Sequence, residues 1–567
     1  DVVNNTGEIR AQTIANQAGR IYLLGEGGAV MVDGKLDASA PNGGNGGNIE
    51  TSADHVRFAD NVRITTAADR GLSGNWLIDP LNFTVAASGG DITGAALGTL
   101  LGSNSIQIET AATSPTASAT NLVGTSGTNG DINVNDAVSW SANNTLTLNA
   151  YRNININADI TASGATGKLA LQYGQGAVAA GNAADYNIAK NIHINLQDGA
   201  NFSTKLGSNA TVENYTVISS AAALLNINSS LSGKFALGAN VNLSGIANFA
   251  PIGNWDLAPD YNPFDGKFTG LGHTVSNLTV SATANPDIKS AGLFSVIYGA
   301  EVRDVRIDAA NVTNNKDRVA VGALAGYAKN SIIKNIDVTN STISANPASF
   351  TVNNRPTAGG IVGYMRDATA VSNSSSSAVV SSTGLAGGIT GTMQGFGGSI
   401  SNTYFSGSVS ANIWAGGIAG EYIAVSDASA INNVYVTGSV TGIGSTSYAG
   451  GIAGRYGDGS LLPTISNAHV SGPITAPTSA NADPIAAYIN VSGGTYGTKG
   501  IMSNVYWDMT TTGLSTTGLA TGFSTAFTGN APTGISNSNA YTQASYTGFD
   551  FTSTGAWFSV DGSTRPF

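Results

Sequence analysis

An internal repeat in the second half of this chain limits its possible folds more than any other pattern. The motif reads Gly-Gly-Ile-X-Gly or a close variant. A degenerate copy surrounds Gly292, and five full copies occupy 322–326, 359–363, 387–391, 416–420 and 450–454. Successive copies lie about 30 residues apart, which is a period typical of solenoids. One such unit cannot bury its apolar face alone, but stacked units form a continuous core.

The glycines of the motif are predicted to form corners between short strands. Glycine tolerates tight corners and positive φ, which residues with a Cβ resist. We therefore assign a structural role to the first and last glycine of every full copy: Gly322, Gly326, Gly359, Gly363, Gly387, Gly391, Gly416, Gly420, Gly450 and Gly454.

A second motif, Ile-Ser-Asn or Ile-Asn-Asn ahead of an alternating run, follows most copies of the first. Clear examples begin at Ile400, Ile431 and Ile465. Amide side chains that repeat coil after coil can hydrogen-bond to their own copies. The asparagine is therefore predicted to stack at a turn, as an internal amide ladder. His469 occupies the position at which other copies of this motif have tyrosine, so it is interpreted as a packing residue.

The remaining chain is dominated by short strands. Polar and apolar residues alternate over 145–150, 153–158 and 191–196, with Gly, Asn, Asp and Ser between the runs. The best helix candidate is 220–226. Together with the repeat, this pattern predicts an all-β chain that folds as a parallel β-helix, in the form of an elongated rod.

Composition argues against several classes of protein. Only 10% of the 567 residues are charged and the net charge is −11. The basic residues are scattered, so nucleic acid is not an expected partner. A run of about 18 apolar residues is missing, so membrane insertion is not expected. The chain has no cysteine and no histidine pair in sequence, so neither a metal nor a cofactor is expected.

Several segments resemble the filamentous haemagglutinin family, the exoproteins of two-partner secretion systems. In the first half of the chain, the segments that show this resemblance are 46–52, 64–66, the Trp-Leu-Ile-Asp-Pro string at 76–80, and 129–140. In the second half, 268–278 and the glycine-rich copies resemble GLUG repeats. The resemblance extends over most of residues 25–515. It implies a right-handed parallel β-helix, export through an outer-membrane secretion partner, and a place outside the cell or on the bacterial surface.

The same resemblance suggests a division of the chain. Residues 1–215 are predicted to form a haemagglutinin-type β-helix region, and 216–515 a GLUG-repeat β-helix region. Residues 516–567 are predicted to be a Gly/Ser/Thr-rich β segment that leads into sequence beyond the chain given.

The most varied chemistry in the chain lies in the loop at 254–268. Aromatic rings can stack on sugars, and carboxylates can bind their hydroxyl groups. Simple packing of the loop over a coil is the alternative. The candidate ligand-binding residues are Trp255, Asp256, Asp260, Tyr261, Phe264 and Asp265.

Three functions remain open from the sequence. The first is a non-enzymatic adhesin, a stalk or binding rod in adhesion, aggregation or biofilm, with a host glycan, a matrix protein or a neighbouring cell surface as partner. The second is a polysaccharide-binding or polysaccharide-degrading β-helix; hydrolysis would require two carboxylates about 5–9.5 Å apart. The third is capture of a host protein or haem carrier by extruded loops.

Overall fold

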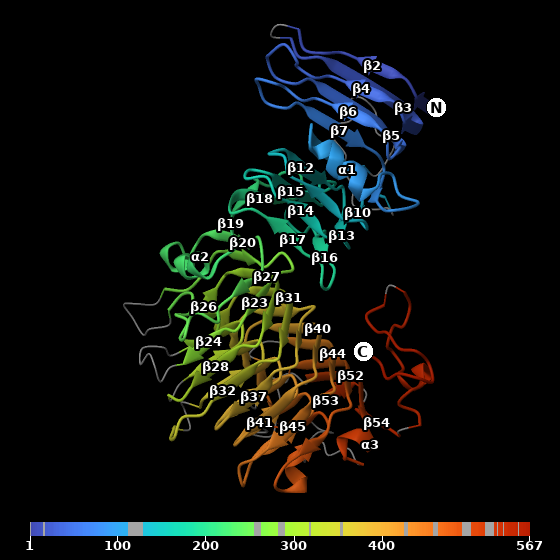
Figure 1. Ribbon diagram of the computed structural model, residues 1–567. Helices are drawn as coiled ribbons and strands as arrows, with labels where there is room; N and C mark the ends of the chain where they lie inside the picture. The colour runs from blue at the N-terminus through green and yellow to red at the C-terminus, as the bar shows by residue number, and fades with distance from the viewer. Residues whose placement is uncertain are drawn as a thin grey trace. The chain divides into compact units, whose positions relative to one another are not determined.

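The computed structural model shows two compact units. Unit 1 comprises 1–219, 234–239 and 270–273, and unit 2 comprises 220–233, 240–269 and 274–567. Within each unit, short strands stack coil upon coil (Figure 1). The structure describes residues 2–14, 17–111, 129–254, 262–281, 290–316, 319–351, 355–424, 429–457, 463–489, 500–515, 527–529, 531–536, 538–553 and 555–567.

Unit 1 consists of a main sheet and three smaller sheets. The main sheet contains β1 (Val2–Asn5), β3 (Arg20–Val32), β5 (Asn48–Phe58), β7 (Asn75–Asp79), β9 (Ser105–Glu109), β12 (Thr145–Asn149), β15 (Lys168–Tyr173), β18 (Gly199–Leu206), β19 (Glu213–Ile218) and β20 (Lys234–Leu237). The smaller sheets contain β2 (Glu8–Arg10), β4 (Lys35–Asp37) and β6 (Arg63–Thr65); β8 (Phe83–Val85), β10 (Ile132–Val134), β13 (Ile154–Ile156) and β16 (Tyr186–Ile188); and β11 (Val138–Trp140), β14 (Ile160–Ala162) and β17 (Ile194–Leu196).

Unit 2 has a long sheet and three further sheets. The long sheet contains β21 (Val241–Asn242), β22 (Lys267–Thr269), β23 (Thr274–Ser276), β27 (Glu301–Asp308), β31 (Ile332–Thr339), β35 (Ala370–Ser372), β36 (Ser375–Ser376), β40 (Ser399–Phe405), β44 (Ala430–Val436), β48 (Thr464–Val470), β52 (Gly500–Asp508), β53 (Phe527–Gly529) and β54 (Thr533–Ile535). The second sheet contains β24 (Thr279–Ser281), β28 (Asn311–Asn314), β32 (Thr342–Ala345), β37 (Val379–Ser382), β41 (Ser408–Ala411), β45 (Ser439–Gly442) and β49 (Ile474–Thr475).

The third and fourth sheets of unit 2 are joined by the glycine-rich motif. The third sheet contains β25 (Ser290–Ala291), β29 (Ala320–Gly322), β33 (Thr357–Gly359), β38 (Leu385–Gly387), β42 (Trp414–Gly416), β46 (Tyr448–Gly450) and β50 (Ala482–Asp483). The fourth sheet contains β26 (Phe294–Tyr298), β30 (Ala325–Lys329), β34 (Val362–Arg366), β39 (Thr390–Gly395), β43 (Ala419–Ala424), β47 (Ala453–Tyr456) and β51 (Ala486–Ile489).

The all-β, right-handed parallel β-helix predicted from the sequence is confirmed. Strands pair in parallel with the equivalent strands of the next coil, for example β31 with β27. An exception is the pair β18 and β19, which is antiparallel and contains a register shift. The alternating runs predicted at 145–150, 153–158 and 191–196 contain β12, β13 and β17. The three-part division of the chain stays a prediction.

Helices are short. The α2 helix (Ala221–Leu225) forms where the sequence predicted it, with the Ser220 hydroxyl accepting from the Ala223 amide. Among the described residues, other short helices are α3 (Met509–Thr512) and the 3-10 turns η1 (Asn226–Ser229), η2 (Ser479–Asn481) and η3 (Gln543–Ser545).

The sequence did not predict the α1 helix (Gly94–Leu101). Glycines at 94 and 98 lower its intrinsic helix propensity. A Cβ on Gly98 would lie 2.3 Å from the Ser139 carbonyl oxygen of β11. Packing against a neighbouring strand, which local sequence does not reveal, therefore requires the glycine.

The motif glycines form tight corners, as predicted, but the expected positive φ is wrong. Glycines with φ in the left-handed region occur elsewhere in the chain. What excludes a side chain at these glycines is the close approach of neighbouring atoms, backbone atoms above all. A Cβ on Gly359 would lie 1.9 Å from the Val362 carbonyl oxygen, and a Cβ on Gly391 would lie 2.1 Å from Thr357 Oγ1. The glycines thus set how closely the third and fourth sheets pack.

Asparagines, rather than the motif glycines, supply the positive φ in most coils of the long sheet, and Asp304 takes that place in β27. Asn335, Asn373, Asn402, Asn433, Asn467 and Asn504 all have φ between 49° and 55°. In β31 this conformation inserts one extra residue into the alternation, so that Ile333, Ile336 and Val338 all point inward and are buried. Each asparagine therefore marks a stacked bulge in a long strand.

The predicted amide ladder is confirmed, although it lies at the surface rather than inside. Asn402 donates to Asn373 at 3.1 Å, Asn433 donates to Asn402 at 3.0 Å, and Asn467 donates to Asn433 at 3.1 Å. Asn504 continues the ladder by donating to Asn467 at 2.9 Å. The ladder ties the bulges of successive coils into one register.

The C-terminal residues of the chain pack against the long sheet. Tyr404, Tyr435, His469 and Tyr506 are register partners on successive strands, and the first two rings stack at 4.7 Å. Tyr506 shares a buried cluster with other apolar side chains: Ile535, Ala540, Tyr546, Phe549 and Trp557.

An ion pair fixes the same segment. The Arg565 guanidinium binds the buried Asp508 carboxylate at 2.6 and 2.8 Å. His469 is 1% exposed beneath the edge of Tyr546, as its interpretation as a packing residue requires.

Substitution at Asn402 tests the ladder. Both Asn402→Gly and Asn402→Ala lose the ladder hydrogen bonds. Alanine also keeps a Cβ in the left-handed region without the polar side chain that makes this conformation tolerable, at a cost of about 1 kcal/mol relative to glycine. We expect stability in the order wild type, Asn402→Gly, Asn402→Ala, measured by urea denaturation. Ser410→Ala in the second sheet is the control. Equal stability of the two Asn402 variants would contradict the assigned φ.

Acid should loosen the C-terminal segment. Burial, with a smaller contribution from the Arg565 guanidinium, lowers the pKa of His469 to about 4. The unfolded form binds the proton more readily, so this group's contribution to stability is complete above pH 6.5 and falls as the pH drops towards 4. The protection factors for hydrogen exchange in the described part of 538–567 should therefore fall over that range. The fall should disappear in His469→Gln; if it persists, another group is responsible.

Candidate binding surfaces

The predicted ligand-binding loop is described only at its base. Trp255, Asp256, Asp260 and Tyr261 lie outside the described residues. Asn254 and Asn262 exchange backbone hydrogen bonds of 2.8 and 3.1 Å. Residues 254 and 262 therefore lie side by side.

The other two residues of that candidate set have different environments. Phe264 is fully buried, and its ring centroid lies 5.0 Å from that of Phe294. It is thus a core residue rather than a ligand-binding one, because it stacks on the next coil. Asp265 is exposed and accepts a hydrogen bond of 2.6 Å from the Ser232 hydroxyl.

A carboxyl group that the sequence did not single out as functional lies on the main sheet of unit 1. Ile78 pairs with Ile108, which places the next residues, Asp79 and Glu109, on neighbouring strands. Burial and the nearby Glu109 and Glu50 carboxylates raise the pKa of Asp79 to about 7. Asp79 Oδ1 is buried and has no hydrogen-bond partner among the described residues. A neutral acid beside a carboxylate is the pairing that general acid catalysis uses.

The sequence signal for this pair was weak. Asp79 belongs to the Trp-Leu-Ile-Asp-Pro string, which was interpreted as structural. Trp76 is indeed buried, and β7 ends at Asp79 just before Pro80. Glu109 lies about 30 residues further along the chain, and only the coil register brings the two carboxyl groups together.

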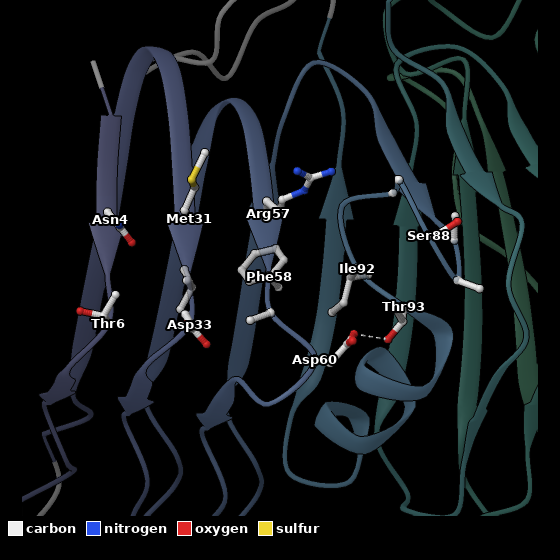
Figure 2. Close-up of a pocket in the computed structure, with 16 residues that line it drawn as sticks. Asn4, Thr6, Met31, Asp33, Arg57, Phe58, Asp60, Ser88, Ile92 and Thr93 are labelled. Carbon is white, nitrogen blue, oxygen red and sulfur yellow. Dashed lines mark hydrogen bonds between the residues drawn. The ribbon is translucent and has the colours of Figure 1, made fainter.

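A hollow of about 520 Å³ lies on unit 1. Asn4, Met31 and Arg57 are register partners on β1, β3 and β5 and line one side of it, as Figure 2 shows. Asp60 lines the other side and accepts a hydrogen bond of 2.9 Å from the Thr93 hydroxyl. The lining mixes a single cation with carboxylates and apolar groups, which suits a small polar ligand.

The fold brings together two histidines that are far apart in sequence. His193 and His273 stack at 5.3 Å in unit 1, and His273 Nε2 lies 3.0 Å from the Ile194 carbonyl oxygen. Burial lowers the pKa of His273 to about 4. Within the described residues, His, Asp and Glu side chains do not gather in threes around a possible metal position. The helices among these residues are all too short or too polar to cross a bilayer.

The fold defines the class, that of a parallel β-helix protein, and comparisons with known proteins do not narrow it. No family model matches the chain, and no curated protein matches it. One matching solved structure is that of a "putative immunoglobulin A1 protease" from Bacteroides ovatus. The identity is 23%, over 51% of this chain and 84% of that one, with a TM-score of 0.40. A likeness at this level carries no argument about activity.

The pH dependence of stability tests the environment of Asp79. A folded-state pKa above the ordinary value means that stability is lost as the pH rises from about 4 through about 7. Asp79→Asn removes that loss, so its melting temperature should exceed that of the wild type at pH 8, and the difference should shrink towards pH 4. The exposed Asp33→Asn is the control. A constant difference at all pH values would show that Asp79 does not titrate abnormally.

Proposed function

We propose that this chain belongs to a secreted bacterial surface adhesin, in which the β-helix displays binding loops and outward-facing side chains. The observation that carries the proposal is the base of the loop at 255–261. Asn254 pairs with Asn262, and Ile252 and Phe264 on either side both pair with the next coil, so the stack continues across this point. A β-helix built in this way can carry variable loops on a constant core, which is how repeat proteins present binding surfaces.

The resemblance of 46–80 to two-partner secretion exoproteins supports the same proposal. It adds export through an outer-membrane partner and a position on the cell surface. The partner of the displayed surface would be a host glycan, a matrix protein or another cell. Capture of a host protein or haem carrier by the loops is a variant of this display role.

One observation favours a second candidate function, degradation of a polysaccharide. Asp79 and Glu109 lie on neighbouring strands, and burial together with the nearby Glu109 and Glu50 carboxylates raises the pKa of Asp79 to about 7. Release of reducing ends from acidic and neutral polysaccharides, lost in both Asp79→Asn and Glu109→Gln, would establish this function. Adhesion without release would leave the pair as a structural feature.

Binding of the purified chain to a glycan array and to matrix proteins tests the adhesin proposal. The matched variant replaces 255–261 with a Gly-Ser segment of equal length and keeps Phe264 and Phe268, which are buried. We expect binding to fall at least tenfold while the melting temperature is unchanged. Unaltered binding by the variant would exclude this loop as the recognition element. If the wild-type chain binds none of the glycans or matrix proteins, the proposal is contradicted.

A further inference from the structure

Two columns of large side chains face each other near the end of unit 2. Trp414 and Tyr448 are register partners at the start of β42 and β46 in the third sheet. Glu421, Arg455 and Tyr488 are register partners on β43, β47 and β51 in the fourth sheet. The two-residue corners of the glycine motif keep these two sheets close, so the columns meet.

The Trp414 ring holds two guanidinium groups. The Arg355 guanidinium carbon lies 4.4 Å from the ring centroid, and that of Arg455 lies 4.8 Å away. Tyr488 stacks on Trp414 at 5.9 Å and contacts Tyr448 edge-on at 5.0 Å. Stacking on an aromatic ring fixes the orientation of a guanidinium fork and so prepares it for a planar anion.

The charges in this cluster do not balance. Arg455 forms an ion pair with Glu421, and both side chains are largely buried. Arg355 has no carboxylate or other hydrogen-bond partner among the described residues, and its Nε atom is buried. Burial and the neighbouring Arg455 lower the pKa of Arg355, although the Glu421 carboxylate acts in the opposite direction. A half-buried cation without a counter-ion costs stability, unlike an exposed one.

We propose that Arg355, held by Trp414, binds the carboxylate or sulfate group of an acidic oligosaccharide. The guanidinium fork matches such a group with two parallel hydrogen bonds. Tyr448 and Tyr488 are partly exposed beside it and offer ring surface and hydroxyl groups to the attached sugar. Glu421 already neutralises Arg455, so the site takes one negative charge. The assignment rests on the proposed surface-binding function for its biological setting and names the class of glycan.

Calorimetric titration of the whole chain with a tetragalacturonate, a sulfated heparin tetrasaccharide and neutral maltotetraose tests the site. We expect one or both acidic probes to bind and the neutral one not to bind. Arg355→Gln should weaken that binding at least tenfold. It should leave the melting temperature unchanged or raise it, because it removes an unpaired cation. The control is Arg366→Gln, which removes the same charge from a side chain 52% exposed and should change affinity less than twofold.

Three results would overturn the proposal. These are no binding of either acidic probe by the wild type, an equal loss of affinity in the Arg355 and Arg366 variants, and a melting temperature several degrees lower in Arg355→Gln. If the chain binds matrix proteins or array glycans but not the acidic probes, the proposed site at Arg355 is contradicted and the adhesin proposal is not. Binding of acidic probes that depends on Arg355, without any attachment to matrix proteins or cells, would support the site and contradict the adhesin role.

Discussion

Coil-to-coil register is the constraint on which the structure of unit 2 depends. From β40 to β52, each long strand contains one asparagine in the left-handed conformation, and the side-chain amides of these asparagines bond from one coil to the next. A shift of one coil by a single residue would break that ladder and turn the inward face of its strand outward. The ladder therefore works together with burial of residues such as Ile333 and Ile336, which lie on either side of the bulge.

The glycine corners provide a second constraint, which acts across the coil rather than along the stack. Because a Cβ on Gly359 or Gly391 would overlap neighbouring atoms, the third and fourth sheets approach more closely than side chains would permit. That approach brings together residues from coils far apart in sequence. The contact of Arg355 and Arg455 with Trp414 is a direct consequence.

Two ionisable groups with displaced pKa values, Asp483 and His469, lie where a residue departs from the repeat. Asp483 stands in register with Gly450, in a further copy of the motif that the sequence did not reveal. Burial raises its pKa to about 8, although the Ile485 and Ala486 amides donate to it. His469 likewise replaces a tyrosine of sibling coils and has a lowered pKa. In a stack of near-identical coils, a residue that differs from the equivalent residues of neighbouring coils still occupies the same buried position, whatever its charge.

The sequence by itself determined the parallel β-helix, the corners and the asparagine ladder, because each arises from a pattern that repeats with the coil. It did not reveal that close approach rather than positive φ requires the motif glycines, or that Phe264 belongs to the core. The Asp79 and Glu109 pair and the cluster around Trp414 were decided only by tertiary structure. Their members belong to different coils, and a side chain's neighbours across coils follow from register and loop length, which no local pattern encodes.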